Sequence, residues 1–367
     1  MQLRVALTAY LLTSVLTVGA ALPAAAAPAA STAPTSANLA IQDILDHLPD
    51  DIVAGALVRW DGVGATAGPV SADAYVRIGS VTKALTNTVV LQLIAEHRID
   101  LDARARRYVP QVLPEAYDGV TVHQLLDHTS GLPKPAPTPG PADGPGWQFK
   151  SVTPEDFLRE SFAAATGTPP DPGSEQQYNG LNSFVLGLIV EKVTGHSFTA
   201  ELERRIIRPL HLRHTSLPSA DDPTILSPHA EVYVDGQDVT EQSPYPWAEG
   251  GVISTAADLD RFMTALFRGR LLPPVEQKLV FEVPAAANGT DNKNCTGKPC
   301  YSTGGLMRYE LPDGEEVWGK TGSRPGWDNG LFATRDLRHR FVYSLNPTGA
   351  GNDLPYIKAL INAALTD

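Results

Sequence analysis

The sequence is poor in basic residues and lacks two familiar enzyme signatures. Its 367 residues carry 29 Lys and Arg against 41 Asp and Glu, a net charge of -12, with no long basic run. Such a chain is not suited to the polyanionic backbone of nucleic acids, so we expect no nucleic-acid partner. It also has no Gly-x-Ser-x-Gly elbow and no His-Glu-x-x-His. These absences argue against an elbow-type Ser-His-Asp hydrolase and against a zinc protease.

Long apolar runs are scarce as well. One covers residues 5–22, follows Arg4 and precedes a proline and several alanines. This order is typical of a secretory signal, so we predict a signal peptide over residues 1–27 and a flexible Ala/Pro/Ser/Thr leader over residues 28–38. An uncleaved anchor is the alternative, but small residues stand where a stop-transfer signal carries Lys or Arg. We predict secretion to the extracellular space or cell envelope, with no stable membrane span after cleavage.

The sequence contains only two cysteines. Cys295 and Cys300 lie in a polar segment near the end of the chain. In an exported protein this spacing favours a local disulfide. A zinc site would need further ligands, so we expect no metal, and nothing in the sequence indicates another cofactor. His211 and His214 are three residues apart without a nearby acidic pair, and we predict them at the surface.

A glycine-rich segment superficially resembles a dinucleotide-binding fingerprint. It covers residues 61–69, but Gly68-Pro69 follows where that motif requires a helix. We therefore predict a hairpin loop there.

Hydrophobic periodicity indicates a mixed fold whose sheet-forming segments lie at both ends of the chain. We predict helices over residues 41–48, 81–99, 154–165, 180–194, 200–207 and 354–365, and strands over residues 52–60, 74–78, 316–318, 330–334 and 341–345. The predicted class is α/β (α+β), in which one domain over residues 39–367 has an antiparallel sheet built from both termini and flanked by helices. A mostly helical insert covers roughly residues 84–250. A site at the seam between sheet and insert is the default expectation.

Chemistry is concentrated in two short motifs. Ser80 and Lys83 stand where a β-branched strand gives way to a helix, and residues three apart share a helix face, so the Lys83 amine reaches the Ser80 hydroxyl. A serine with an adjacent base is a candidate nucleophile. Ser-x-x-Lys is common by chance, but here Lys320-Thr321-Gly322 follows beside a predicted strand, and the joint pattern is specific.

With these motifs, the chain resembles the serine β-lactamase and penicillin-binding-protein superfamily, in its class C-like branch with secreted D-alanyl-D-alanine carboxypeptidases. The resemblance extends over nearly all of residues 39–367. The matching stretches are residues 77–83, 125–132, 195–197 and 250–259.

The resemblance implies a set of catalytic roles. Ser80 attacks a carbonyl, Lys83 and Tyr178 move its proton, and Lys320 lowers the free energy of ionising Tyr178 and attracts a substrate carboxylate. The backbone N–H groups of Ser80 and Ser323 are implied to form the oxyanion hole. The remaining implied substrate-binding residues are Thr321, Gly322, Trp247 and Arg308.

Two of these assignments have structural alternatives. Trp247 matches an active-site tryptophan of the carboxypeptidases, but core packing is an equally good interpretation. Arg308 lies near the position of an arginine that binds the terminal carboxylate, although the alignment needs a one-residue shift, and a solvated loop arginine is the alternative.

The chain departs from the family's Tyr-x-Asn motif. Tyr178 matches its tyrosine, but Gly180 stands where the asparagine that holds the substrate amide belongs. Asn179 and Asn182 flank this position at the wrong offset, where each can satisfy local backbone groups. The departure concerns substrate positioning rather than acylation.

The resemblance implies a D-alanyl-D-alanine carboxypeptidase that acts on peptidoglycan-type peptides and is acylated by β-lactams. The alternative is a class C-like β-lactamase or an esterase, whose substrate would be a small acyl compound. The Lys of Lys-Thr-Gly and the missing asparagine favour this alternative. A non-catalytic ligand-binding homologue is a third reading, and the intact motif residues argue against it.

Overall fold

A computed structural model of the chain describes residues 36–366, except residues 291, 293–294 and 296. The predicted signal peptide and residues 28–35 of the predicted leader lie outside the described residues. The first described helix, α1 (Ser36–Asp46), begins within the predicted leader. Among the described helices, none is long and apolar enough to cross a membrane.

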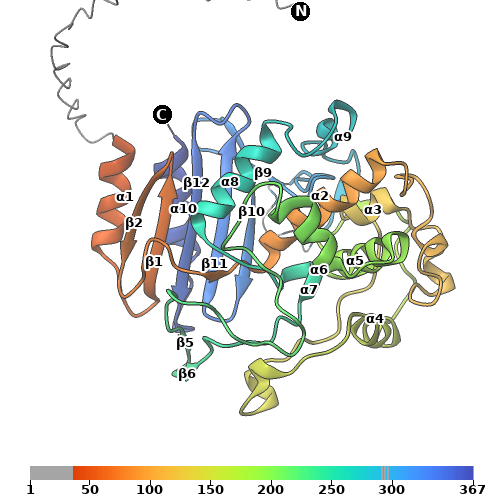
Figure 1. The fold of residues 1–367 in the computed structure, drawn as a ribbon, viewed down its shortest axis with the longest axis horizontal. Coiled ribbons are helices and arrows are strands. Elements are labelled where there is room, and N and C mark those ends of the chain that lie inside the picture. Colours follow the sequence, from red (N-terminus) through yellow and green to blue (C-terminus); the bar gives the residue numbers. More distant parts are fainter. Residues whose placement is uncertain (1–35, 291, 293–294, 296, 367) are drawn as a thin grey trace, which may run out of the picture. The chain divides into compact units, whose positions relative to one another are not determined.

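The centre of the fold is a six-stranded antiparallel sheet in the order β2-β1-β12-β11-β10-β9 (Figure 1). The first strand of the sheet pairs directly with its last, Val58 opposite Tyr343. The prediction of an antiparallel sheet built from both ends of the chain is therefore confirmed. The strands are β1 (Val53–Trp60), β2 (Val63–Ala67), β9 (Met307–Glu310), β10 (Glu316–Arg324), β11 (Trp327–Thr334) and β12 (Arg340–Pro347).

Helices cover both faces of this sheet because its strands are apolar on both sides. Phe341 and Tyr343 of β12 share a core with Ile41 of α1 and Leu360 of α10 (Leu354–Leu365). Val342, whose side chain alternates with theirs, belongs to the core that contains α8 (Ala256–Phe267). The two-residue period of the strand thus assigns successive side chains to opposite layers.

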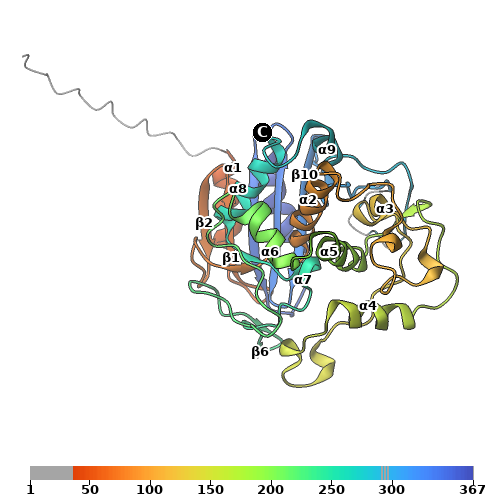
Figure 2. The same cartoon turned by 45° about the vertical axis from the view of Figure 1, so that its right-hand side comes forward.

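Helices joined by long loops are the main regular elements of the segment between the two halves of the sheet (Figure 2). Its central helices α2 (Thr82–Ala95) and α5 (Leu181–Thr194) are buried on nearly all sides and pack against each other. A helix buried all round needs no polar face, and both are apolar over most of their length. The other helices are α3 (Val122–Leu126), α4 (Pro154–Ala163), α6 (Phe198–Leu202), α7 (Trp247–Gly250) and α9 (Pro274–Leu279).

Three small sheets accompany the main one: β3 (Val76–Arg77) with β7 (Ile253–Ser254), β4 (Glu175–Gln176) with β8 (Ala287–Asn288), and β5 (Tyr233–Val234) with β6 (Gln237–Asp238).

Two local predictions need correction. The segment predicted as a loop over residues 61–69 contains a strand, β2, which pairs with β1 after a two-residue turn at Asp61 and Gly62. Positive φ at both turn residues fits the hairpin turn that matches strand twist. The predicted strand 74–78 is only the two-residue β3, and it pairs with β7 instead of joining the main sheet.

Two glycines allow the turn that carries Ser80 to lie directly against β10. This turn is a short 3-10 helix, η1 (Gly79–Val81). A Cβ on Gly322 would lie 2.1 Å from the carbonyl oxygen of Ile78 and 2.8 Å from the nitrogen of Ser80. Gly79 has φ +51, and a Cβ there would lie 2.5 Å from the oxygen of Ser323. Only glycine fits either position without moving backbone.

Replacing Gly322 with Ala tests this contact. We expect Gly322→Ala to lower the free energy of unfolding by about 1 to 3 kcal/mol, as overpacking does, and to reduce activity because β10 must move away from Ser80. Thermal unfolding and substrate turnover measure the two effects. The control is Gly64→Ala in β2, where a Cβ would be 3.8 Å from its nearest neighbour. Equal stability of the two variants would contradict the close-contact interpretation.

Candidate active site

Ser80 and Lys83 lie at the junction of η1 and α2, in the arrangement that their spacing predicts. Ser80 belongs to η1 and Lys83 to the first turn of α2. The Lys83 ammonium donates a hydrogen bond of 2.8 Å to Ser80 Oγ. Ser80 is partly exposed, whereas Lys83 is buried. The hydroxyl is thus open to a ligand while its neighbouring amine is not.

Glu249 of α7 supplies the negative charge that accompanies the buried Lys83. The Lys83 ammonium contacts Glu249 Oε1 in an ion pair and donates to the Glu249 backbone oxygen at 3.1 Å. Burial lowers the pKa of Lys83, but the Glu249 carboxylate and Tyr178 outweigh it and hold that pKa above its ordinary value. Lys83 is therefore an ammonium in the resting site.

Tyr178 lies between two ammonium groups. Lys83 Nζ is 5.1 Å and Lys320 Nζ is 4.8 Å from the centre of its ring. Burial raises the pKa of Tyr178, and the positive charges of Lys320 and Lys83 more than compensate, so the pKa is below its ordinary value. Burial also lowers the pKa of Lys320. The pKa values of Tyr178 and Lys320 are therefore both lower, and closer to neutral pH, than those of the free side chains.

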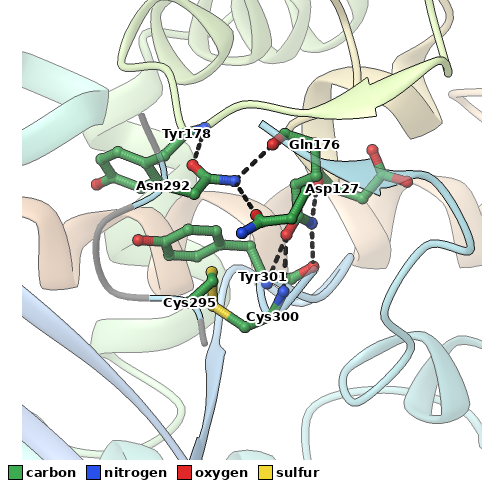
Figure 3. The surroundings of a disulfide bond; sticks show 8 residues. Asp127, Gln176, Tyr178, Asn292, Cys295, Cys300 and Tyr301 are labelled. Atoms are coloured by element: carbon green, nitrogen blue, oxygen red, sulfur yellow. Dashed lines mark hydrogen bonds between the residues drawn. A yellow bond between two sulfur atoms is a disulfide. The ribbon is translucent and has the colours of Figure 1, made fainter. Parts of the chain in front are cut away.

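The disulfide supports the segment that carries Tyr178 (Figure 3). Cys295 and Cys300 are bonded, which confirms that prediction. Gln176 Oε1 accepts hydrogen bonds from the backbone nitrogens of Cys300 and Tyr301, and Asn292 Oδ1 accepts one of 2.7 Å from the nitrogen of Tyr178.

The rings beside Tyr178 complete this support. Tyr301 stacks on Tyr178 with the ring centres 4.8 Å apart, and His128 lies 4.7 Å from it on a loop. Burial, with the charges of Lys83 and Lys320, holds the pKa of His128 well below its ordinary value, so this ring is neutral. Its Nδ1 accepts a hydrogen bond from the nitrogen of Asn179, which is a structural role. The surroundings therefore fix the orientation of Tyr178.

A cavity of about 220 Å³ opens onto Ser80. Glu249, Ser323 and Arg324 line it together with Ser80. Burial lowers the pKa of Arg324 to about 10, which still leaves a cation at neutral pH. The other lining residues are Thr138, Pro139, Trp147, Gln148, Lys150, Ser243, Tyr245, Pro246 and Pro325.

This geometry suits transfer of an acyl group to a serine. The Ser80 hydroxyl is hydrogen-bonded to an ammonium, and Tyr178, whose pKa is lowered, lies beside that ammonium. The backbone nitrogens of Ser80 and Ser323 both lie at the η1–β10 contact, where developing negative charge on a carbonyl oxygen would be stabilised. Among the described residues, no group of three or more His, Cys, Asp or Glu could hold a metal ion.

Comparison with known proteins agrees with this geometry. A model of the family described as beta-lactamase matches residues 50–366. The chain belongs to the beta-lactamase family.

Sequence identity and coverage relate the chain to individual known proteins. Esterase EstB of Burkholderia gladioli is 33% identical over 182 residues, which is 46% of this chain and 44% of that esterase. A D-stereospecific amidohydrolase from Streptomyces sp. is 32% identical with a TM-score of 0.78, over 89% of this chain and 98% of the other.

A D-amino acid amidase from Ochrobactrum anthropi SV3 shares the fold, at 24% identity and a TM-score of 0.73 over 90% of this chain and 98% of that one. The chain spans less than half the length of the first curated relatives that it matches. The fold is thus that of a serine hydrolase superfamily with esterase and amidase members.

Two residues predicted to bind substrate lie away from the cavity at Ser80. Trp247 packs against Phe184 and Phe198, and its ring occupies the space beside Gly187. Arg308 lies on β9, at the edge of the main sheet, and pairs with Glu316 at 3.2 Å. The contacts of Trp247 are those of its core-packing alternative, whereas Arg308 is an ion-paired strand residue and not the solvated loop arginine of its alternative. Thr321 and Gly322 lie on β10 next to Lys320 and Ser323, as their sequence requires.

Sequence patterns did not identify most of the cavity lining, and Glu249 and Arg324 are the charged residues of that lining with the most direct bearing on the site. Arg324 directly follows Ser323 on β10, so its nearness to Lys-Thr-Gly was the available signal. Glu249 lies 169 residues from Ser80, yet the Ser80 hydroxyl donates to its Oε1 at 3.4 Å. A Cβ on Gly180 would lie 3.1 Å from the same oxygen. Glu249 therefore occupies the space next to Gly180, the position of the missing asparagine.

The charge of Lys320 controls the ionisation of Tyr178, and this predicts a pH effect. The phenolate is the charged form, so removing the cation raises the pKa of Tyr178 and shifts the rise of kcat/KM with pH to more alkaline pH. For Lys320→Met we expect the pH midpoint of the rising limb of the kcat/KM profile to increase by about 1 to 3 units. The measured quantity is this midpoint and not the maximal rate. The exposed Lys192→Met is the control with the same charge change. A limb that stays in place would contradict this role of Lys320.

Proposed function

We propose that the protein hydrolyses amide and ester bonds of small acyl donors through an acyl-enzyme on Ser80, with amides and short peptides of D-amino acids as the substrate class. The observation that carries this proposal is the hydrogen bond between Lys83 and Ser80 beside a tyrosine flanked by two ammonium groups. The substrate class is supported by the likeness to the D-stereospecific amidohydrolase, which extends over 98% of that chain. The predicted signal peptide supports the further proposal that it acts outside the cell.

Acylation follows from the protonation states of the site. Because Lys83 is an ammonium, the base of this step is the phenolate of Tyr178: Lys83 gives a proton to that phenolate as it takes one from Ser80, and Ser80 Oγ attacks the carbonyl carbon. The oxyanion forms near the backbone nitrogens of Ser80 and Ser323. Collapse of the intermediate then releases an amine or alcohol, which takes the proton back from Tyr178. Water hydrolyses the remaining ester of Ser80.

A carboxypeptidase on D-alanyl-D-alanine peptides is a second candidate, and Arg324 favours it. Its guanidinium lies in the cavity beside Ser323, and Nη2 donates to the Ser243 oxygen at 2.9 Å. A cation next to the nucleophile suits a substrate with a free carboxylate, as D-Ala-D-Ala peptides and β-lactams have. In this proposal Arg324 takes the role that the sequence suggested for Arg308.

A parallel assay on one purified sample tests the proposed function. The substrates are D-phenylalanine amide and its L-enantiomer, a diacyl-L-Lys-D-Ala-D-Ala peptide, nitrocefin and a p-nitrophenyl ester. We expect turnover of the D-amide and the ester, a preference for the D- over the L-amide, and loss of all turnover and covalent labelling in Ser80→Ala. Labelling that persists in Ser80→Ala, or a preference for the L-amide, would refute the proposal.

Arg324→Gln separates the two candidate substrate classes. If Arg324 holds a carboxylate, kcat/KM for the D-Ala-D-Ala peptide falls roughly 10- to 100-fold, the value of a hydrogen bond to a charged group, while the D-amide is affected less. Arg308→Gln, outside the cavity, is the matched control. Equal loss for both substrates would show that Arg324 does not distinguish them.

A further inference from the structure

The strongest unassigned feature is the carboxylate of Glu249, which pairs with Lys83 beside Ser80 but exchanges no proton in acylation as derived above. Oε1 contacts the Lys83 ammonium and accepts a hydrogen bond of 3.4 Å from the Ser80 hydroxyl. Its side chain is 21% exposed and lines the cavity at Ser80. Glu249 therefore reaches the reacting atoms from the open side of the site.

Space for this carboxylate comes from Gly180. A Cβ at that position would lie 3.1 Å from Glu249 Oε1 and 3.2 Å from its Cγ, so a larger side chain would have to displace Glu249. An asparagine amide at residue 180 and the observed carboxylate compete for the same volume. The absence of an asparagine at position 180 and the presence of the Glu249 carboxylate are therefore linked.

Acylation of Ser80 frees one acceptor position on this carboxylate. In the resting site the Ser80 hydroxyl donates to Oε1, whereas the ester of an acylated Ser80 has no proton to donate. A water that replaces this donor on Oε1 lies next to the ester carbon, because that carbon is bonded to Ser80 Oγ. A carboxylate that accepts a hydrogen bond from such a water is placed to take its proton.

We propose that Glu249 is the general base of deacylation, a role that rests on the proposed acyl-enzyme on Ser80. Glu249 takes one proton from water as the water oxygen forms a bond to the ester carbon and the carbonyl electrons move to the oxyanion. When the oxyanion collapses, the bond from the carbon to Ser80 Oγ breaks, and Oγ takes a proton from the Lys83 ammonium. Glu249 then returns its proton to Lys83, and the products are a carboxylic acid and free Ser80.

Pre-steady-state kinetics with p-nitrophenyl acetate separate the two half-reactions. The initial burst of p-nitrophenol reports acylation, and the steady rate reports deacylation. In Glu249→Gln, which keeps an oxygen for Lys83 but loses the base, we expect a full burst and a steady rate roughly 10²- to 10⁴-fold lower. Acetylated Ser80 then accumulates and is detected by mass spectrometry. The control is Glu241→Gln, an exposed carboxylate outside the cavity, with wild-type kinetics expected.

A second variant keeps the proposal testable if Glu249→Gln folds poorly. In Glu249→Ala, added formate supplies a carboxylate of the same chemistry, and we expect it to accelerate the steady rate but not the burst. Thermal unfolding of each variant shows that the compared samples are folded.

Three outcomes would overturn the proposal. If burst and steady rate fall together without acyl-enzyme accumulation, Glu249 only positions Lys83. An unchanged steady rate removes any role for it. In both cases the proposed function stands, because wild-type turnover and its loss in Ser80→Ala are measured independently. A wild-type protein that is never acylated by amide or ester refutes the proposed function and this role together.

Discussion

The buried ammonium of Lys83 is the constraint on which the site depends. Only 1% of the residue is exposed, and a charge taken out of water is destabilising unless polar groups surround it. Ser80 Oγ, the Glu249 backbone oxygen and the Glu249 carboxylate are those groups. They come from η1 and α7, so α2 can bury its first turn only where these two elements meet it. The packing of α2 against η1 and α7 therefore also brings together the side chains that surround Ser80.

Burial and the attraction between opposite charges together set the pKa values of Tyr178 and Lys320. Desolvation raises the pKa of a phenol and lowers that of an ammonium, so burial disfavours the charged forms of both Tyr178 and Lys320. Close together they stabilise one another's charged forms, which holds the pKa of Tyr178 below its usual range. The disulfide loop holds the tyrosine in this position through Gln176 and Asn292, at a distance from the reacting atoms.

The exchange of an asparagine for Gly180 with Glu249 beside it changes what the site offers a substrate. An amide both donates and accepts hydrogen bonds, whereas a carboxylate only accepts. The position next to the nucleophile thus loses a donor for a peptide carbonyl and gains a negative charge, and that charge is balanced by Lys83. Arg324 and Lys150 also line the cavity, and their positive charges are compatible with substrates that carry a carboxylate.

Sequence alone determined the sheet from both termini, the helical segment between them, the Ser80–Lys83 pair and the disulfide, because each depends on local periodicity or short spacing. It fails where a short segment's partner decides its state: the residue pattern predicts a loop where β2 lies and a strand of the main sheet where β3 lies. Trp247 and Arg308 were matched by position along the chain, which does not say which way a side chain faces. Glu249 was invisible because its 169-residue separation from Ser80 is closed only by the packing of α7 against α2. Contacts between distant segments are set by how whole elements bury their surfaces, and only the tertiary structure decided them.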